Sequence, residues 1–333
     1  MKKFQLLPLT LAMGAAFVTQ AHADESAPEV VLATEYVNID RQGTKVKTNV
    51  VTTQEKDEST ATSLRELLQS EPSIHFSGGN GTSSYLTIRG MGQNSIDVKV
   101  DNAYSDSQIL YHQGRHMLDP SLVKIVSVQK GAGSASAGIG ATNGAIVAKT
   151  VDAQDLLKEG QDIGFKVSAG YSSNSEHNYG VTGFGKSGDF DFLVSYNQVN
   201  QDNYKPGSKA TRHTSAESEA TKYVSPYTAI NPEHPSDEVA FQAMDKESYL
   251  AKVGYNLGSD HRFVLSHFNT TNKGVRNIRE EFDVFAGNVG EYRELSMQNT
   301  NLEYKGKAGS LGDAEANVYF MKNERQSAGD TGN

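Results

Sequence analysis

Two histidines and a tyrosine lie close together in the sequence YHQGRH, residues 111–116. His112 and His116 are four residues apart, a spacing that on a helix would bring both imidazoles to one side, where they could bind zinc. The HExxH pattern of zinc hydrolases is absent, because Gln113 stands where the glutamate would be. A glycine between the histidines and an Asp-Pro pair after them favour a loop. A catalytic zinc site is therefore not expected. The alternative interpretation is that His112 and His116 are solvated histidines of a loop.

A tract of glycine, alanine and serine follows at residues 131–144. Glycine-rich tracts cradle phosphates in P-loops, which require lysine and then serine or threonine directly after the last glycine. Here Lys130 precedes the glycines, and the tract itself contains no Gly-Lys-Ser or Gly-Lys-Thr sequence. The tract therefore predicts close packing of backbone against backbone, which small side chains and positive φ angles permit.

The first 23 residues have the pattern of a secretory signal peptide. A basic start precedes a short apolar stretch, and the segment ends in Ala-His-Ala at residues 21–23. The apolar stretch is well short of the roughly 20 residues that span a bilayer as a helix. We therefore expect cleavage after Ala23 and an exported chain. Because the chain has no cysteine, packing, a closed sheet or a membrane must stabilise it instead of disulfides.

The composition excludes several classes of protein. A formal net charge of −9 without a basic stripe argues against a nucleic-acid partner. A hydrophobic content of 37% and a mean hydropathy of −0.52 are too polar for a helical membrane protein, but they suit a transmembrane β-barrel with its alternating strands. No Ser/His/Asp order, paired-carboxylate spacing or cysteine nucleophile stands out, so we do not expect an enzyme.

The first half of the chain predicts a small mixed α+β unit that ends near residue 151. Residues 45–54 alternate as a strand does, and a short helix that Ser59 or Thr62 would cap follows and ends by Pro72. Further strands are predicted at 85–89, 96–100, 122–130 and 144–151. Two of these strands have assigned faces: Ile96, Val98 and Val100 share one face, and Val123 and Ile125 face opposite to Val126 and Val128.

The second half of the chain changes to a repeating strand pattern. Seven segments of roughly ten alternating residues are legible: 162–172, 178–187, 189–199, 248–257, 261–270, 295–307 and 314–322. Short turns separate some segments, and the long polar segments 200–246 and 271–292 separate others. Strands of about 9–11 residues with such connections are what a tilted outer-membrane barrel requires, whereas a soluble β-sandwich explains the asymmetry poorly. Aromatic residues near the strand ends predict an interfacial girdle: Tyr171, Tyr196, Tyr255, Phe268, Tyr304, Tyr319 and Phe320.

The stretch from about residue 60 to residue 151 resembles the plug domain of TonB-dependent outer-membrane receptors. The resemblance rests on the sequences LRELLQSEPSIHFSGGNG, YLTIRGMG, VKVDNAYSD and LDPSLVKIVSVQKGAGSASAGIGATNGAIVAKT. In this family a helix leads to a glycine-rich turn and an Ile-Arg-Gly strand, followed by a Val-Asp-Gly hairpin and an Asp-Pro segment. Asn102 replaces the usual glycine of the hairpin, and Ala132 replaces a common proline.

The resemblance implies an α+β plug domain followed by an antiparallel transmembrane β-barrel, which has 22 strands in the complete family. The chain would then divide into a signal peptide (1–23), a TonB-box region and linker (24–44), the plug domain (45–151) and the N-terminal part of the barrel (161–333). Seven strands cannot close a barrel, because the last edge would leave unpaired backbone groups in lipid. We therefore expect an incomplete, C-terminally truncated barrel that does not transport alone.

The resemblance also assigns roles to residues. The TonB box, which pairs as a strand with the periplasmic TonB protein, would be Glu29, Val30, Val31, Leu32 and Ala33. The residues that pack the plug would be Arg89, Gly90, Asp119, Pro120 and Gly131. In haem receptors of the family, a histidine eight residues before the proline helps to ligate haem iron, and His112 has this spacing. Tyr111 and His116 beside it are also suitable iron ligands.

The function implied is that of a Gram-negative outer-membrane receptor for haem or another iron compound, carried as ligand and not as a cofactor. A ferric-siderophore receptor is one alternative, because some siderophore receptors resemble the same loop. The other is an outer-membrane protein that grips a host protein such as haemoglobin. The segment 200–246 offers residues for such contacts: His213, Tyr223, Tyr227 and His234.

Overall fold

The computed structural model of the chain describes residues 49–51, 61–69, 71–77, 85–105, 118–131, 142–173, 175–203, 243–276, 291–307, 309 and 312–327. The predicted signal peptide, the predicted TonB box and the residues Tyr111, His112 and His116 lie outside these ranges. We refer to the described residues from 49 to 156 as the plug, after the resemblance, and to the seven strands that follow as the barrel sheet. No helix in the described ranges is long and apolar enough to cross a bilayer.

The helix near the start of the plug, α3 (Leu64–Leu67), is capped by Ser63, whereas Ser59 or Thr62 was predicted. The Ser63 hydroxyl accepts a hydrogen bond of 3.3 Å from the backbone N–H of Glu66. The Glu66 carboxylate in turn accepts one of 2.6 Å from the N–H of Thr62. The prediction was wrong because it overlooked this spacing: only Ser63 lies three residues before a glutamate, as reciprocal capping requires. The helix ends ahead of Pro72, as expected.

Two small sheets make up most of the plug. Their strand orders are β1-β7-β8-β5-β6 and β2-β3-β4. The strands are β1 (Asn49–Val51), β2 (Ile74–Ser77), β3 (Tyr85–Ile88), β4 (Met91–Gly92), β5 (Ile96–Val100), β6 (Ala103–Tyr104), β7 (Val123–Lys130) and β8 (Gly144–Thr150). Three short helical elements accompany them: η3 (Gln93–Ser95), η4 (Pro120–Leu122) and α4 (Ala153–Leu156). The shared burial of Ile96, Val98 and Val100 confirms the predicted face of β5.

Two hairpins of the plug turn on pairs of residues with positive φ. Arg89 (φ 53°) and Gly90 (φ 78°) join β3 to β4, and Asp101 (φ 49°) and Asn102 (φ 62°) join β5 to β6. Two-residue hairpin loops of this kind require left-handed backbone, which glycine, asparagine and aspartate tolerate best. Asn102 can therefore replace the family's usual glycine without changing the turn.

Strand β7 departs from the predicted alternation. Val123 and Val128 are both fully buried, although their odd spacing would put them on opposite faces of a regular strand. The register with β8 shifts between Val123 and Ile125, so that Lys124 is an extra residue. Such a bulge reverses the alternation after it. The predicted assignment of Val123 and Val128 to opposite faces was therefore wrong.

Gly144 lies where β7 and β8 approach closely. A Cβ atom at this position would lie 2.6 Å from the backbone oxygen of Gln129 and 3.0 Å from Cδ1 of Ile88. We expect Gly144→Ala to lower the free energy of unfolding of the plug by about 1–3 kcal/mol, as overpacked cores do. Chemical denaturation would measure this loss. Gly183→Ala is the control, since nothing lies within 4 Å of the added Cβ, and an equal loss in both variants would contradict the prediction.

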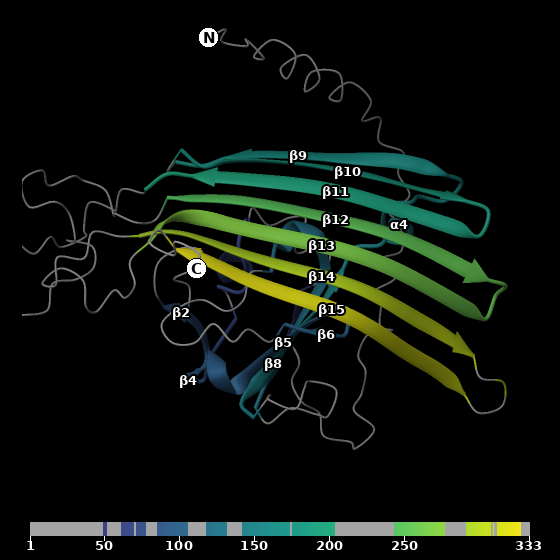
Figure 1. The fold of residues 1–333 in the computed structure, drawn as a ribbon, viewed down its shortest axis with the longest axis horizontal. Coiled ribbons are helices and arrows are strands. Elements are labelled where there is room, and N and C mark those ends of the chain that lie inside the picture. Colours follow the sequence, from purple (N-terminus) through teal and green to yellow (C-terminus); the bar gives the residue numbers. More distant parts are fainter. Residues whose placement is uncertain are drawn as a thin grey trace, which may run out of the picture. The chain divides into compact units, whose positions relative to one another are not determined.

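Seven antiparallel strands run side by side in sequence order as the barrel sheet (Figure 1). They are β9 (Ile163–Tyr171), β10 (His177–Ser187), β11 (Phe190–Gln201), β12 (Met244–Leu257), β13 (His261–Arg276), β14 (Glu291–Lys307) and β15 (Asp313–Ser327). All seven predicted strands are confirmed. Strands β12 to β15 contain 14 to 17 residues, more than the roughly ten expected. The prediction was too short because both faces of these strands become polar toward their far ends, where the sequence resembles that of a loop.

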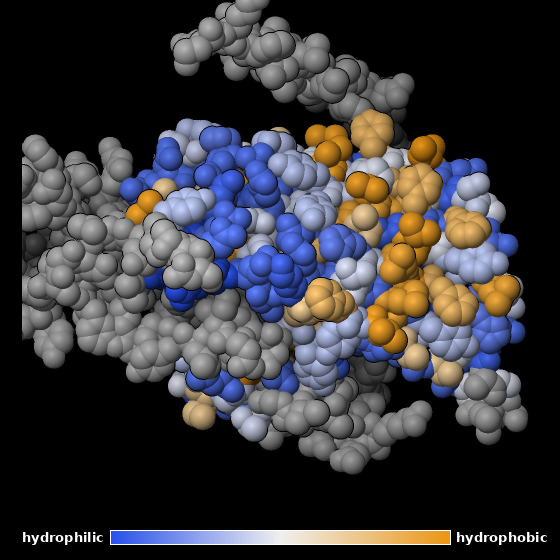
Figure 2. All heavy atoms as spheres, viewed as in Figure 1, coloured by the Kyte–Doolittle hydropathy of each residue, from blue (hydrophilic) through white to orange (hydrophobic). Residues whose placement is uncertain are grey.

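The face of the barrel sheet opposite the plug carries an apolar band. Figure 2 shows apolar side chains gathered over one end of the sheet, the end with the short turns. Cross-strand neighbours form one aromatic row there: Phe190, Tyr255, Phe263 and Tyr304. A second row includes Tyr196 and Tyr249, six residues from Tyr255 along β12. Six residues span about 20 Å, close to the about 25 Å of a membrane-facing band.

The predicted girdle is only partly correct. By strand register, five of its members face outward: Tyr171, Tyr196, Tyr255, Tyr304 and Phe320. Phe268 faces the plug instead, is 2% exposed and belongs to the apolar core. Tyr319 is paired with Asn301 and also lies on the inward face. Since adjacent strand residues face opposite sides, Tyr319 and Phe320 could not both belong to one girdle.

Candidate functional site

Strand β12 places two lysines against the plug. Lys246 and Lys252 are six residues apart and therefore lie on the same face of the strand. Each side chain is only 6% exposed. An isolated buried ammonium group is costly, so each lysine has to be paired with acceptors inside the protein.

Lys246 binds two segments of the plug. Its ammonium group lies 3.3 Å from the Asp119 carboxylate and donates a hydrogen bond to the backbone carbonyl of Thr62. Asp119 is buried and caps η4 by accepting a hydrogen bond of 2.9 Å from the N–H of Ser121. Asn197 of β11 donates a further hydrogen bond of 3.3 Å to the same carboxylate. Two neighbouring barrel strands thus hold the segment that begins η4.

Lys252 holds the end of β8 and the start of α4. Its ammonium group lies 2.8 Å from the Asp152 carboxylate and 3.8 Å from that of Asp101, and it donates to the carbonyl of Thr150 at 3.3 Å. Lys124 of β7 pairs with the same Asp152 at 2.8 Å. These contacts join four plug segments to one point of β12.

Asp101 connects this cluster to the hairpin between β5 and β6. Its carboxylate accepts hydrogen bonds from the backbone N–H of Thr150, at 2.9 Å, and from the Thr150 hydroxyl. Its backbone carbonyl accepts one of 2.7 Å from the Asn301 side chain on β14. The carboxylate is therefore satisfied on several sides, as a buried charge requires.

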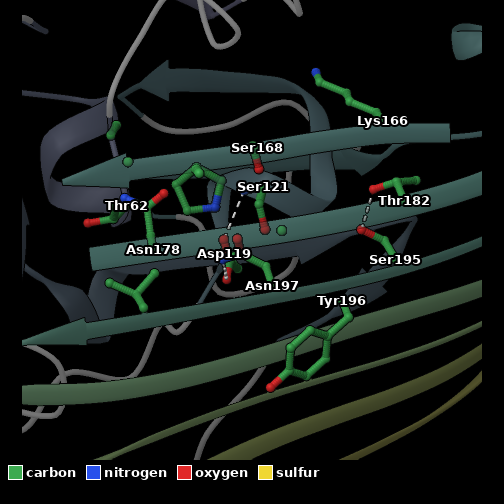
Figure 3. A pocket seen from close by; sticks show the side chains of 16 residues that line it. Thr62, Asp119, Ser121, Lys166, Ser168, Asn178, Thr182, Ser195, Tyr196 and Asn197 are labelled. Atoms are coloured by element: carbon green, nitrogen blue, oxygen red, sulfur yellow. Dashed lines mark hydrogen bonds between the residues drawn. The ribbon is translucent and has the colours of Figure 1, made fainter. Parts of the chain in front are cut away.

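A cavity of about 310 Å³ lies beside Asp119, between the plug and strands β9 to β11. Figure 3 shows its polar side chains: Thr62 and Ser121 from the plug, Lys166 and Ser168 from β9, Asn178 and Thr182 from β10, and Ser195 and Asn197 from β11. The hydroxyls of Thr182 and Ser195 lie 2.7 Å apart, and Tyr196 points away from the group. The polar lining suits water or a hydrophilic solute.

Lysine partners lower the pKa values of two plug carboxyls, those of Asp119 and Asp152. Burial by itself would raise the pKa of the Asp119 carboxyl, but the Lys246 ammonium and the N–H of Ser121 outweigh it and hold that pKa below its usual range. In the same way, Lys252 and Lys124 overcome the effect of burial and depress the pKa of Asp152. The Lys246–Asp119 pair and the Lys252–Asp152 pair are therefore both charged at neutral pH.

These depressed pKa values predict how the stability of the plug depends on pH. A carboxyl whose pKa is lower in the folded state contributes stability above its unfolded pKa of about 3.9 and loses it as the pH falls through the folded value. The contribution of Asp119 and Asp152 to the free energy of unfolding should therefore be constant from about pH 7 to pH 5 and decline below about pH 4. Denaturant unfolding at several pH values measures this. The prediction is wrong if the free energy of unfolding of the wild type already falls between pH 7 and pH 5 and Asp119→Asn abolishes that fall.

Comparison with known proteins agrees with this architecture. Residues 40–145 match the TonB-dependent Receptor Plug Domain. A solved structure of the FrpB iron transporter from Neisseria meningitidis, variant F3-3, is 53% identical, with a TM-score of 0.74 over 87% of this chain and 42% of that chain. The chain therefore contains a plug domain of the TonB-dependent receptor type, followed by a sheet similar to that of the FrpB structure. The predicted plug followed by an open antiparallel sheet is thereby confirmed as the fold.

Two curated relatives of the chain have names that refer to haem. The heme transporter BhuA of Brucella ovis is 26% identical over 78% of this chain and 35% of its own length. The hemin receptor of Yersinia enterocolitica is 34% identical over 41% of this chain and 20% of its own length. The chain thus spans about a third of the BhuA sequence and less than half of the FrpB structure. The names of these relatives describe transporters and receptors.

Not all predicted site residues lie in the described ranges. Tyr111, His112, His116 and Glu29–Ala33 lie outside them. Within the ranges, no group of three or more His, Cys, Asp or Glu residues could hold a metal ion. The structure therefore describes the support of the predicted ligand loop and not the loop itself.

The predicted packing residues occupy different environments. Asp119 and Pro120 are buried at the start of η4, against β12. Arg89 and Gly90 form an exposed hairpin turn. Gly131 has a φ of 116°, and a Cβ atom there would lie 3.6 Å from Nη1 of Arg89. The packing residues therefore divide between the interface with the barrel sheet and the far side of the plug.

Sequence reasoning missed the two lysines of β12. Lys246 was placed at the end of a long polar segment, and Lys252 was treated as one polar residue of an alternating strand. The available signal was their position, because lysines at alternate positions on the inward face of a barrel strand must find acceptors in the lumen. Their partners lie 100 or more residues away in sequence and could not be identified from spacing.

Proposed function

We propose that the chain is part of an outer-membrane receptor that takes up haem or another iron compound with energy supplied through TonB. The main support is the 53% identity with an iron transporter over 87% of the chain, together with a plug held against a barrel sheet. The haem-related names of the Brucella and Yersinia relatives support the same class of ligand.

The ligand site we propose is the loop that carries Tyr111, His112 and His116. Imidazole and phenolate groups are suitable ligands for iron. The loop directly precedes Leu118 and Asp119, which are buried between the plug and β12. A fixed base of this kind would limit the positions available to the ligand residues and so favour a defined geometry.

The remaining proposals concern the ends and boundaries of the chain. Residues 1–23 would be cleaved as a signal peptide, and Glu29–Ala33 would pair with TonB as an added strand. The domain boundaries would be 24–44 for the TonB-box region and linker, 45–151 for the plug domain and 161–333 for the N-terminal part of the barrel. Outer-membrane lipid would cover the apolar band of the barrel sheet.

Two identities of the iron compound have separate support. The name of the FrpB structure specifies iron, which favours a ferric chelate such as a siderophore complex. The names of BhuA and the hemin receptor favour haem, either free or delivered by a host protein of the haemoglobin type. The spacing of His112 from Pro120 agrees with the haem proposal.

Direct titration tests the proposed function. The protein, purified from outer membranes, would be titrated with haemin while the Soret band is followed, and separately with ferric citrate while intrinsic tyrosine fluorescence is followed. Saturable binding of either probe in the micromolar range or below supports the proposal, and the responding probe identifies the ligand class. Absence of binding with both probes contradicts it.

A further inference from the structure

Lys246 is the point at which two distant segments of the plug meet the barrel wall. Its single ammonium group contacts Asp119, at the start of η4, and Thr62, just before α3. These two plug residues are 57 positions apart in sequence. All three residues are less than one tenth exposed.

The two plug segments adjoin different proposed sites in the sequence. Asp119 follows the loop of residues 111–117, where we have placed the iron ligands. Thr62 precedes α3 and follows the N-terminal segment that contains the proposed TonB box. Its N–H is hydrogen bonded to the Glu66 carboxylate, so the position of Thr62 is tied to the start of α3. Lys246 therefore connects the ligand side of the plug with the TonB side.

The pairing of β12 with its neighbouring strands fixes the backbone position of Lys246. Strand β12 is paired along its length with β11 and β13, and Lys246 lies opposite Val199 and Asn272 in those ladders. A rigid backbone holds the ammonium group between its acceptors, so displacement of one acceptor changes the field and the geometry at the other. Coupling between sites requires a shared element of this kind.

Lys252 provides a natural comparison on the same strand. It has the same exposure and faces the same way, but its acceptors are Asp101, Thr150 and Asp152. These residues lie at the β5–β6 hairpin and at the end of the plug. Lys252 therefore anchors the plug without touching either the base of the ligand loop or the segment before α3.

We infer that Lys246 is a positioning residue that couples the base of the ligand loop at Asp119 to the segment before α3 at Thr62. The inference rests on the proposed function for the identity of the two ends. In this arrangement, binding of an iron compound that shifts Asp119 alters the hold of Lys246 on Thr62, and thereby the N-terminal segment available to the periplasmic partner. By reciprocity, a pull on the N-terminal segment alters the ligand loop.

Hydrogen–deuterium exchange on the full chain in detergent tests the coupling without any ligand. Lys246→Met should accelerate exchange at least tenfold in both peptides, 61–69 and 118–124. Asp119→Asn keeps Lys246 but weakens its fixed position, and it should accelerate exchange in 61–69 at least threefold as well as in 118–124. Lys252→Met is the matched control and should accelerate exchange in 148–156 while the 61–69 peptide stays within twofold of the wild type.

The decisive result is which peptides exchange faster in each variant. Loss of a lysine with only a general structural role would accelerate exchange in all of these peptides alike. An unchanged 61–69 peptide in Asp119→Asn overturns the coupling, as does equal acceleration of that peptide by Lys246→Met and Lys252→Met. If Lys246→Met fails to assemble, Asp119→Asn and Lys252→Met still give the decisive comparison.

A second arm separates the coupling from the proposed function. Haemin or ferric citrate, whichever binds, should change exchange in the 61–69 peptide of the wild type, and Lys246→Met should abolish that change while still binding the probe. A bound probe with no effect on 61–69 in the wild type overturns the relay to the ligand. If neither probe binds, the proposed function fails, and the ligand-free comparison alone decides the coupling.

Discussion

Lys252→Met is expected to lower the free energy of unfolding of the plug by about 3–5 kcal/mol, because it leaves buried carboxylates without their cation. Asp101 is 3% exposed and loses its lysine, while Asp152 keeps only Lys124. Methionine approximates the length and volume of the lysine stem, so the loss reports on charge and not on a cavity. Denaturant unfolding followed by exchange in peptide 148–156 measures the change.

Lys305→Met is the control for this experiment. Lys305 pairs with Glu315 at 3.6 Å on the barrel sheet, but its side chain is 48% exposed. Exposed pairs contribute about 0–1 kcal/mol, so this variant should change stability by less than 1 kcal/mol. The prediction is wrong if both variants lose the same amount, since burial would then have no role in the strength of the anchor.

His112→Ala is expected to weaken binding of the responding iron probe at least tenfold, because it removes a proposed bond to the metal. For haemin, the shift of the Soret band on binding should be reduced or lost. Tyr111→Phe removes only the phenolate oxygen and would show whether tyrosine contributes separately. Both variants should keep the plug and barrel folded, since neither residue belongs to the described core.

His267→Ala controls for the general loss of a histidine. His267 lies on the outward face of β13, where its Nδ1 is 2.8 Å from the Thr300 hydroxyl. This variant should bind the probe like the wild type. Unchanged affinity in His112→Ala would remove His112 from the ligand site, even if the receptor function itself is supported by titration of the wild type.

Local features of the plug could be predicted because neighbouring residues determine them. Ile96, Val98 and Val100 alternate on one strand, and Asp101-Asn102 have the side chains that tolerate positive φ in a tight hairpin. The same kind of local information placed all seven barrel strands. The capping of α3 was also readable in principle, since Ser63 and Glu66 have the required spacing.

Features that depend on pairing between strands were harder to predict. The extra residue Lys124 in β7 reverses the alternation, but a bulge is defined only by the register with β8. The direction of Phe268 was misjudged for a related reason: aromatic residues suit both an interfacial girdle and a buried core, and only the register with Leu250 and Asn299 distinguishes them.

The sequence by itself determined the resemblance to a plug domain, the order of plug and barrel sheet, and the position of most strands, because these depend on local patterns and contiguous motifs. The tertiary structure alone identified Lys246 and Lys252 as two buried lysines that hold the plug. Lys246 and Thr62 are 184 residues apart, and Lys252 and Asp152 are 100 apart. No local sequence rule links such pairs. They interact because folding removes both partners from water, and each buried polar group must then bind the partner that the fold brings close to it.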